Sequence, residues 1–328
     1  MKQLGLFGLG AGVDKRSEEL PLARRAAAVA AALPPTVRFG TSSWTFPGWG
    51  GIVYAGRPTQ RELVDEGLAE YARFPLFRTV GIDRSYYAPL SDLELGDYAR
   101  ALPDDFRCAM KMWNAVTSAC DPRTFAPMAT FLDPAIALTR VIEPVQRSFA
   151  RHIGPIMIEL PPMRGPHRPS PREVAEKLDA FLAAMPRDLT FSVELRNREL
   201  LTREYLSVLA RHGAGHVLNW WEAMPTLRKQ LSLPGIFTSS TVVCRLLLPP
   251  GRRYEAQREA FAPFDRLVDP DEEMRADVLA LLERAIREKR AVYVLINNKA
   301  EGCSPLTALA IAERFVAIRG PSALPPSE

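Results

Sequence analysis

The chain has 328 residues, of which 47% are hydrophobic and 24% are charged, and this balance predicts a globular protein of one large domain or two modest ones. The formal net charge of +4 would suit an anionic ligand but is too small to indicate nucleic-acid binding by itself. No run approaches the ~20 apolar residues of a membrane-spanning helix. The four cysteines lack metal-binding spacing, so we expect a soluble, cytoplasmic protein with reduced thiols.

Residues 1–35 are predicted to form a flexible leader and then an alanine-rich helix, which ends at Pro34 and Pro35. The charged run DKRSEEL interrupts the apolar stretches of this region, so we do not expect a secretory signal. The glycines of GLFGLGAG (5–12) could serve a phosphate-binding loop, but no convincing strand precedes them.

From residue 36 onward, short apolar runs typical of buried strands alternate with helical patterns, such as those at 171–185, 202–213 and 271–290. Eight strands alternating with helices predict an α/β protein with a TIM-type (β/α)8 barrel at 36–320 and a tail at 321–328. A doubly wound open sheet is the competing architecture. The predicted strands are 36–40, 77–83, 106–112, 155–160, 189–195, 215–220, 241–247 and 291–297.

Polar residues stand at the end of most predicted strands, in phase with small or apolar residues that would face the barrel interior. Ala109 precedes Lys111 in this way, and Val243 precedes Arg245. Barrel enzymes build their active sites at the carboxyl ends of the strands. We therefore expect one mouth of the barrel to collect Asp83, Lys111, Glu159, Glu194, Arg245 and Asn297.

Carboxylates on neighbouring strands favour acid-base chemistry. Glu194 is the candidate general base or nucleophile, Glu159 is its candidate acid partner, and Asp83 is a third candidate catalytic carboxylate. The alternative for Glu194 is an ion pair with Arg196 that only satisfies itself. Basic side chains would hold ligand anions, and amides would orient the ligand: Lys111, Arg196, Arg245, Asn297 and Asn298.

Aromatic residues gather in the segments that follow the predicted strands. Trp44 and Trp49 follow the first strand and Tyr87 follows the second, so they are candidate stacking platforms for a sugar ring or a base. The alternative is that these rings pack only against their own loops.

The histidines do not fall at the predicted mouth, so we expect neither a catalytic metal site nor any other cofactor. Magnesium held through water by Asp83 and the two glutamates is the remaining metal hypothesis.

Six segments, taken in order, resemble the domain of unknown function 72 (YecE-like) family: GTSSWTFPGW, TVGIDRSYYAPL, FRCAMKMWNAVT, IELPP, VELRN and NNKAEGCSPLTALA. The resemblance implies a TIM-barrel-like fold and no settled activity. The chain departs from the family pattern at Gly81, where a carboxylate is common, and at Ser118 and Asn197, where histidines are common.

Together these features predict an enzyme of hydrolase or lyase type that acts without a metal on a small polar, phosphorylated or sugar-like ligand. One alternative is a nucleic-acid-binding barrel, in which Arg252, Arg253 and the loop aromatics would contact the backbone and bases of the nucleic acid. The other is a non-catalytic metabolite-binding protein. The long connection at 249–270 is a candidate lid over the mouth.

Overall fold

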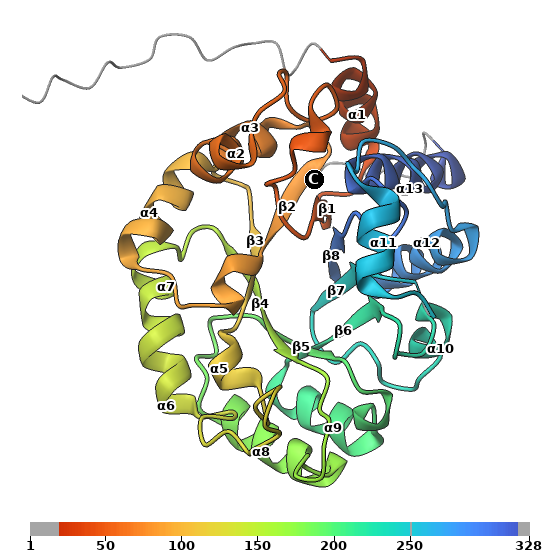
Figure 1. Ribbon diagram of the computed structural model, residues 1–328. Helices are drawn as coiled ribbons and strands as arrows, with labels where there is room; N and C mark the ends of the chain where they lie inside the picture. The colour runs from red at the N-terminus through yellow and green to blue at the C-terminus, as the bar shows by residue number, and fades with distance from the viewer. Residues whose placement is uncertain (1–19, 250, 321–328) are drawn as a thin grey trace, which may run out of the picture.

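Eight parallel strands, hydrogen-bonded in chain order from β1 to β8 and back to β1, close into a barrel (Figure 1). The computed structural model describes residues 20–249 and 251–320. Each of the eight predicted strands is confirmed, with ends that differ by about two residues or fewer. The strands are β1 Val37–Thr41, β2 Phe77–Ile82, β3 Cys108–Lys111, β4 Ile153–Leu160, β5 Phe191–Leu195, β6 Gly215–Trp220, β7 Thr241–Leu246 and β8 Ala291–Ile296.

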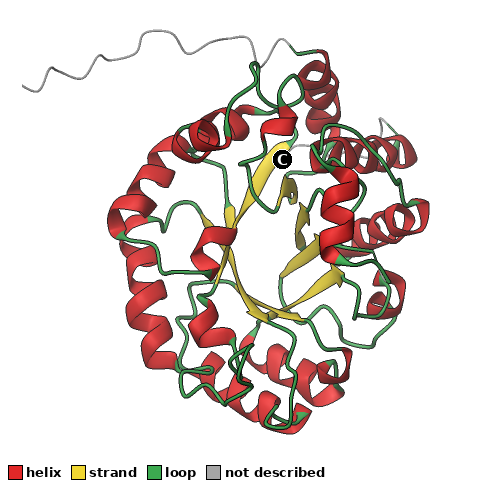
Figure 2. Ribbon diagram, viewed as in Figure 1, coloured by secondary structure: helices red, strands yellow, loops and turns green. Residues whose placement is uncertain are grey.

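Helices surround the strands on the outside, so the chain forms the predicted TIM-type (β/α)8 barrel (Figure 2). The helices are α1 Pro21–Ala32, α2 Gln60–Asp65, α3 Gly67–Arg73, α4 Asp92–Ala101, α5 Asn114–Thr117, α6 Pro134–Ala137, α7 Glu143–Ser148, α8 Pro171–Ala183, α9 Arg203–His212, α10 Leu227–Leu231, α11 Tyr254–Phe261, α12 Glu272–Arg287 and α13 Ser304–Arg319. Short 3₁₀ turns lie at η1 Pro47–Trp49, η2 Asp83–Tyr86 and η4 Arg198–Leu200, and a π-helical turn lies at η3 Leu138–Ile142.

Local sequence explains where the main helices start and stop. The Ser170 hydroxyl accepts a hydrogen bond from the Glu173 backbone N–H while the Glu173 carboxylate accepts one from the Ser170 backbone, which is a capping box at the start of α8. Gly213 ends α9 in the left-handed conformation, at φ 65°. These signals set where α8 begins and where α9 ends.

The predicted N-terminal helical extension is present as α1, which packs against α13. Ala23 and Ala26 are buried in this contact, and Arg25 pairs with Glu313 at 2.8 Å on its edge. The predicted flexible leader at 1–19 and the tail at 321–328 lie outside the described residues. None of the helices within 20–249 and 251–320 combines the length and the apolar character that crossing a bilayer requires.

The barrel interior is a second, smaller core, separate from the layer between strands and helices. It is filled by six side chains from five of the strands, namely Ala109, Met157, Val217, Val243, Tyr293 and Leu295. This apolar plug fixes the depth of the site, because the next inward-facing residue on several strands lies one step nearer the carboxyl-terminal mouth.

Candidate functional site

Charged side chains form the layer directly above the apolar plug. Lys111 follows Ala109 on β3, Glu159 follows Met157 on β4, and Arg245 follows Val243 on β7, each two residues farther along its strand. The strand register also places Glu159 beside Glu194. The alternation of inward and outward side chains is therefore what brings these charges together, as the sequence predicts.

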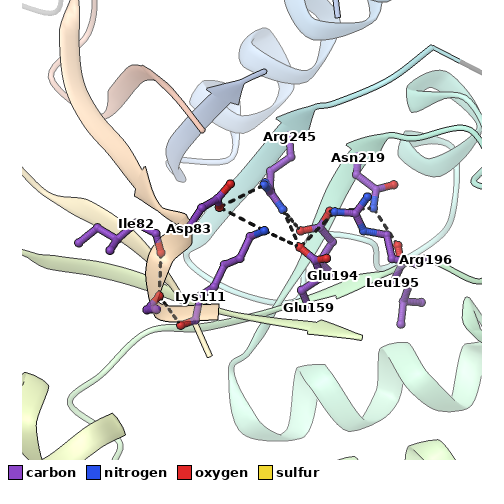
Figure 3. Close-up of polar contacts among 10 residues, drawn as sticks. Ile82, Asp83, Lys111, Glu159, Glu194, Leu195, Arg196, Asn219 and Arg245 are labelled. Atoms are coloured by element: carbon purple, nitrogen blue, oxygen red, sulfur yellow. Dashed lines mark hydrogen bonds and ion pairs between the residues drawn. The ribbon is translucent and has the colours of Figure 1, made fainter. Parts of the chain in front are cut away.

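Six charged residues meet in this layer and will be called the mouth cluster: Asp83, Lys111, Glu159, Glu194, Arg196 and Arg245 (Figure 3). Three are acidic and three are basic, so their formal charges cancel. Apart from Asp83, which is partly exposed, all of them are buried. The predicted convergence at one mouth is confirmed for Asp83, Lys111, Glu159, Glu194 and Arg245.

Arg245 is the centre of the mouth cluster. One of its terminal nitrogens lies 3.1 Å from Glu159 and also contacts Glu194, and the other lies 3.7 Å from Asp83. Burial alone would lower the pKa of this guanidinium, but the carboxylates of Glu194, Asp83 and Glu159 outweigh it and raise the pKa. Arg245 therefore stays charged at any pH at which the protein is folded.

Glu159 bridges all three cations. Its Oε2 lies 2.9 Å from Lys111 Nζ and 3.1 Å from a terminal nitrogen of each arginine. Burial favours the neutral acid, but Arg196, Lys111 and Arg245 together lower the pKa of Glu159 well below its usual range. In this arrangement Glu159 is ionised at neutral pH, and it can donate a proton only if cations move away from it.

Lys111 and Arg196 complete the mouth cluster. Lys111 Nζ also lies 3.1 Å from Asp83, and although burial opposes its charge, Asp83 and Glu159 raise the pKa of the ammonium group. Arg196 follows β5 directly and lies 2.9 Å from Glu194 and 3.1 Å from Glu159. Each cation is thus shared between at least two carboxylates.

Asn219, on β6, is a site residue that the sequence analysis did not identify. Its amide nitrogen donates to the Leu195 carbonyl at 2.8 Å and to Glu194 at 3.4 Å, while its side-chain oxygen is buried without a hydrogen-bond partner among the described residues. The Gln230 side chain holds the Asn219 backbone through two hydrogen bonds, of 3.2 and 2.8 Å. Asn219 on β6 is paired in register with Arg245 on β7, and this pairing is the signal that could have identified it.

Two aromatic rings cover cations of the mouth cluster. Arg196 lies 4.2 Å from the centre of the Trp221 ring, and Lys111 Nζ lies 5.0 Å from the centre of the Tyr86 ring. Burial, followed by the charge of Glu159, raises the pKa of the Tyr86 hydroxyl, so it stays protonated. The predicted platform in this loop is the neighbouring Tyr87, which is 73% exposed and whose ring meets that of Tyr86 in a T-shaped contact.

Trp44 and Trp49 do not serve as the predicted stacking platforms, because both are buried in the core. The Trp44 indole donates to the Leu63 carbonyl at 3.0 Å. Trp49 has no exposed surface and donates to Asn298 at 3.3 Å. These rings anchor the loop after β1, and neither presents a free face to a ligand.

The two candidate asparagines after β8 lie at the same end of the barrel. The Asn298 side-chain oxygen accepts hydrogen bonds from the backbone and hydroxyl of Ser304 at 2.8 and 2.7 Å, so it fixes the start of α13. The Asn297 oxygen accepts from the Lys299 backbone at 3.1 Å. Their side-chain hydrogen bonds go to Lys299, Ser304 and Trp49 instead of the mouth cluster, and those of Asn298 stabilise the loop and the start of α13.

The departure from the family pattern at Gly81 has a steric reason. A β-carbon at this position would lie 2.7 Å from the Ser42 carbonyl oxygen, so no side chain fits between β1 and β2 without a shift. The first carboxylate on this side of the mouth is therefore Asp83, two residues later.

A cleft of about 350 Å³ opens beside the mouth cluster. One wall comes from the segment after β3, between Asn114 and Phe125, and the other comes from Pro161 to Arg164 after β4. Tyr86, whose ring covers Lys111, also lines this cleft. The cleft was not anticipated from the sequence, because two separate loops form it.

The segment at 249–270 contains α11 and is anchored at its far end. Val268 and Asp269 both donate backbone hydrogen bonds to the Glu301 carbonyl, at 2.7 and 3.2 Å. At its near end, Arg252 pairs with Asp269 at 2.9 Å and the Tyr254 ring lies 4.2 Å from Lys299 Nζ. The first turn of α11 thus rests on the loop after β8, close to the mouth.

In residues 20–249 and 251–320, no group of three or more His, Cys, Asp or Glu side chains is placed to hold a metal ion. Each carboxylate of the mouth cluster is paired with at least two cations. Chemically, the basic side chains of the mouth cluster can bind an anion by exchanging a carboxylate partner within the cluster for an oxygen of the ligand.

A family model described as "Protein of unknown function DUF72" matches residues 38–327. A solved DUF72 family protein from Thermotoga maritima is similar at a TM-score of 0.60 and 20% identity, covering 85% of this chain and 98% of that chain. One from Enterococcus faecalis has a TM-score of 0.61 and 16% identity, covering 89% of this chain and 99% of that chain. At such identities the likeness supports the barrel fold alone. A search of curated proteins found no match.

Proposed function

Because this chain belongs to the DUF72 family of proteins of unknown function, we propose its activity from the residues at the mouth of its barrel. The protein binds a polar, anionic ligand at this mouth and acts on it as a hydrolase or lyase. The observation that carries this proposal is a set of buried polar atoms at the mouth without hydrogen-bond partners among the described residues. They are the Nε atoms of Arg196 and Arg245, the indole nitrogen of Trp221 and the side-chain oxygen of Asn219.

Buried donors rarely stay unpaired in folded proteins, because the cost of their lost hydration is not repaid. Three of these four atoms are donors, and two belong to guanidinium groups, which match phosphate and carboxylate oxygens in geometry. The single acceptor, on Asn219, would take a hydrogen bond from a ligand hydroxyl. A hydroxylated anion, such as a sugar phosphate or a sugar acid, satisfies the whole set.

Ligand binding would also prepare the carboxylates for chemistry. When ligand oxygens take over Arg245 and Arg196, Glu194 loses part of its pairing and becomes available as a base or nucleophile. Two of the three cations that lower the pKa of Glu159 are then shared with the ligand, which raises this pKa and brings Glu159 closer to the protonated form of a general acid.

The spacing of the two glutamates constrains a glycosidic mechanism. Glu159 and Glu194 oxygens lie 3.1 and 2.9 Å from one shared nitrogen of Arg196, so they are at most about 6 Å apart. That separation is closer to the spacing of retaining glycosidases than to the wider gap that holds a water in inverting ones. For a sugar ligand, the geometry therefore favours a covalent intermediate on Glu194.

The test compares a phosphorylated sugar with the same sugar without its phosphate. We expect glucose 6-phosphate to raise the melting temperature of the wild type while glucose does not, and a ligand at 100 times its Kd to add about 2.7 kcal/mol of stability. Arg245→Met should abolish the response. Equal stabilisation by glucose, or an unchanged response in Arg245→Met, would contradict anion recognition at the mouth.

Turnover separates an enzyme from a binding protein. Products from ligands that stabilise the wild type should appear with the wild type and disappear with Glu194→Gln, while ligand binding persists. Binding without any product would instead support the non-catalytic metabolite-binding alternative.

A further inference from the structure

The cleft adjoins the mouth cluster at Tyr86, and its walls follow directly on the strands that carry two mouth-cluster residues. Asn114, on one wall, lies three residues after Lys111, and Pro161, on the other wall, lies two residues after Glu159. Tyr86 belongs to both places, because its ring covers Lys111 and lines the cleft. A ligand that binds at the mouth cluster and extends past Tyr86 would enter this cleft.

The cleft differs from the mouth in character. Its lining includes the carbon-rich Pro122, Phe125, Pro161 and Met163 and none of the mouth-cluster side chains. Polar residues stand among them, namely Asn114, Ser118, Asp121 and Arg164. Proline, phenylalanine and tyrosine rings offer flat apolar surfaces, which suit a ring-shaped apolar group. Its volume of about 350 Å³ falls within the range of small-molecule pockets.

The two walls are held together by specific contacts. The Cys120 thiol lies 3.6 Å from the His167 carbonyl oxygen. Phe125 has a positive φ of 58°, and its ring packs so closely over Gly165 that a β-carbon there would lie 2.8 Å from it. The cleft is thus built by two loops that brace each other.

We propose that the ligand has two parts: an anionic group bound by the mouth cluster and an apolar, ring-sized group bound in the cleft between residues 114–125 and 161–164. This rests on the proposed function and narrows its substrate class to anions that carry an aryl or similar planar substituent. Tyr86 separates the two parts and contacts both.

A matched pair of probes tests the proposal without hydrolysis, because the carbon–phosphorus bond of a phosphonate is stable in water. Methylphosphonate offers the anion alone, and benzylphosphonate adds the ring. By isothermal titration calorimetry we expect benzylphosphonate to bind with about tenfold lower Kd than methylphosphonate. Benzyl alcohol, which has the ring without the anion, should bind too weakly to measure.

Cys120 reports directly on the cleft, because it lines the cleft and is partly exposed, whereas Cys108, Cys244 and Cys303 are buried. N-ethylmaleimide should therefore modify Cys120 first. Near-saturating benzylphosphonate should slow this reaction about fivefold, and methylphosphonate should leave its rate unchanged.

Substitutions within one wall provide the control. Ser118→Trp fills the cleft and should remove the advantage of benzylphosphonate while methylphosphonate binds as before. Arg123→Trp adds the same bulk at an exposed position outside the lining and should change neither affinity. If Ser118→Trp fails to fold, Pro162→Trp on the exposed opposite wall replaces it.

The outcomes separate the two proposals. If methylphosphonate does not bind, the proposed function fails at the mouth. If it binds but the ring adds neither affinity nor protection of Cys120, the two-part ligand alone is wrong. Protection by benzyl alcohol equal to that by benzylphosphonate would also overturn it, because the ring would then bind independently of the mouth.

Discussion

Each charge of the mouth cluster has at least two partners of opposite sign. Glu194, for example, contacts both Arg196 and Arg245, and each of those arginines also contacts Glu159. Buried charges need such compensation, since an isolated one costs several kcal/mol. Stability alone therefore cannot separate a structural from a chemical role for Glu194, but recovery by an added anion can.

Glu194→Gln should lower the free energy of unfolding by about 3 to 5 kcal/mol, because two buried guanidinium groups lose a counter-charge. Inorganic phosphate should then stabilise the variant more than the wild type, by supplying the missing charge at the mouth. Denaturant unfolding with and without phosphate measures both effects.

Glu301→Gln is the matched control for Glu194. Glu301 is fully buried and binds Arg275 through two contacts of 2.8 Å, but it lies outside the mouth cluster. We expect comparable destabilisation without recovery by phosphate. Equal behaviour of the two variants would assign Glu194 a purely structural role.

His216 should make stability depend on pH. It is buried between Tyr205, whose hydroxyl lies 2.9 Å from Nδ1, and Gln230, whose side-chain oxygen lies 3.4 Å from Nε2. Burial lowers the His216 pKa to about 4, so the unfolded state binds more protons between that value and the ordinary pKa of about 6.5. Stability from this group is therefore complete above that window and lost as pH falls through it.

From pH 7 to pH 5 this loss is about 2 kcal/mol. We expect urea unfolding of His216→Gln to show a smaller decrease over the same interval than the wild type does. Parallel decreases in the two proteins would mean that His216 is not the group responsible.

At the scale of single residues, the sequence predicts the charges better than the aromatics. The alternation along each strand is enough to place Lys111, Glu159 and Arg245 in one layer. It cannot distinguish Tyr86 from Tyr87, because the 3₁₀ turn after β2 decides which ring turns inward. It also misses Asn219, whose role depends on its neighbours Leu195 and Glu194.

At the scale of elements, the strands are predictable and the loops are not. Each strand is a run of buried, mostly apolar residues, so β1 to β8 could each be predicted from their own short segment of sequence. The loop after β1 carries Trp44 and Trp49 into the core, and the cleft needs two loops that are distant in sequence. Such features arise from tertiary packing, which no local pattern encodes.

The lid hypothesis for 249–270 belongs to this scale. Arg252 and Arg253 are exposed just before α11, so trypsin should cut there. If the segment covers the bound ligand, saturating benzylphosphonate should slow this cut, while cleavage at the exposed Arg24 of α1 should not change. Mass spectrometry of the fragments measures both rates. Unaltered cleavage before α11 would identify a plain connector.

At the scale of the whole molecule, the nucleic-acid-binding alternative requires basic and aromatic side chains that a nucleic-acid strand can reach. The net charge is +4, the formal charges of the mouth cluster cancel, and Arg252 is paired with Asp269. Trp44 and Trp49, which would have stacked on bases, are buried. Of the three predicted stacking platforms, Trp44 and Trp49 are therefore unavailable to a base, whereas Tyr87 is 73% exposed.

We expect a fluorescent oligonucleotide, single-stranded or duplex, to bind more weakly than about 100 μM at 0.15 M salt. Fluorescence anisotropy measures this affinity. Micromolar binding that weakens steeply as salt is added would revive the nucleic-acid-binding alternative, because such a dependence reports the release of many counterions.

Arg245 also has a consequence for how the barrel assembles. It joins β7 to Glu159 on β4, 86 residues away, and to the chain after β2. These contacts can form only when both sides of the barrel are already in place, so they should arise after the rate-limiting step of folding. In stopped-flow kinetics, Arg245→Met should accelerate unfolding and leave the refolding rate nearly unchanged, whereas slower refolding would place this arginine in the folding nucleus.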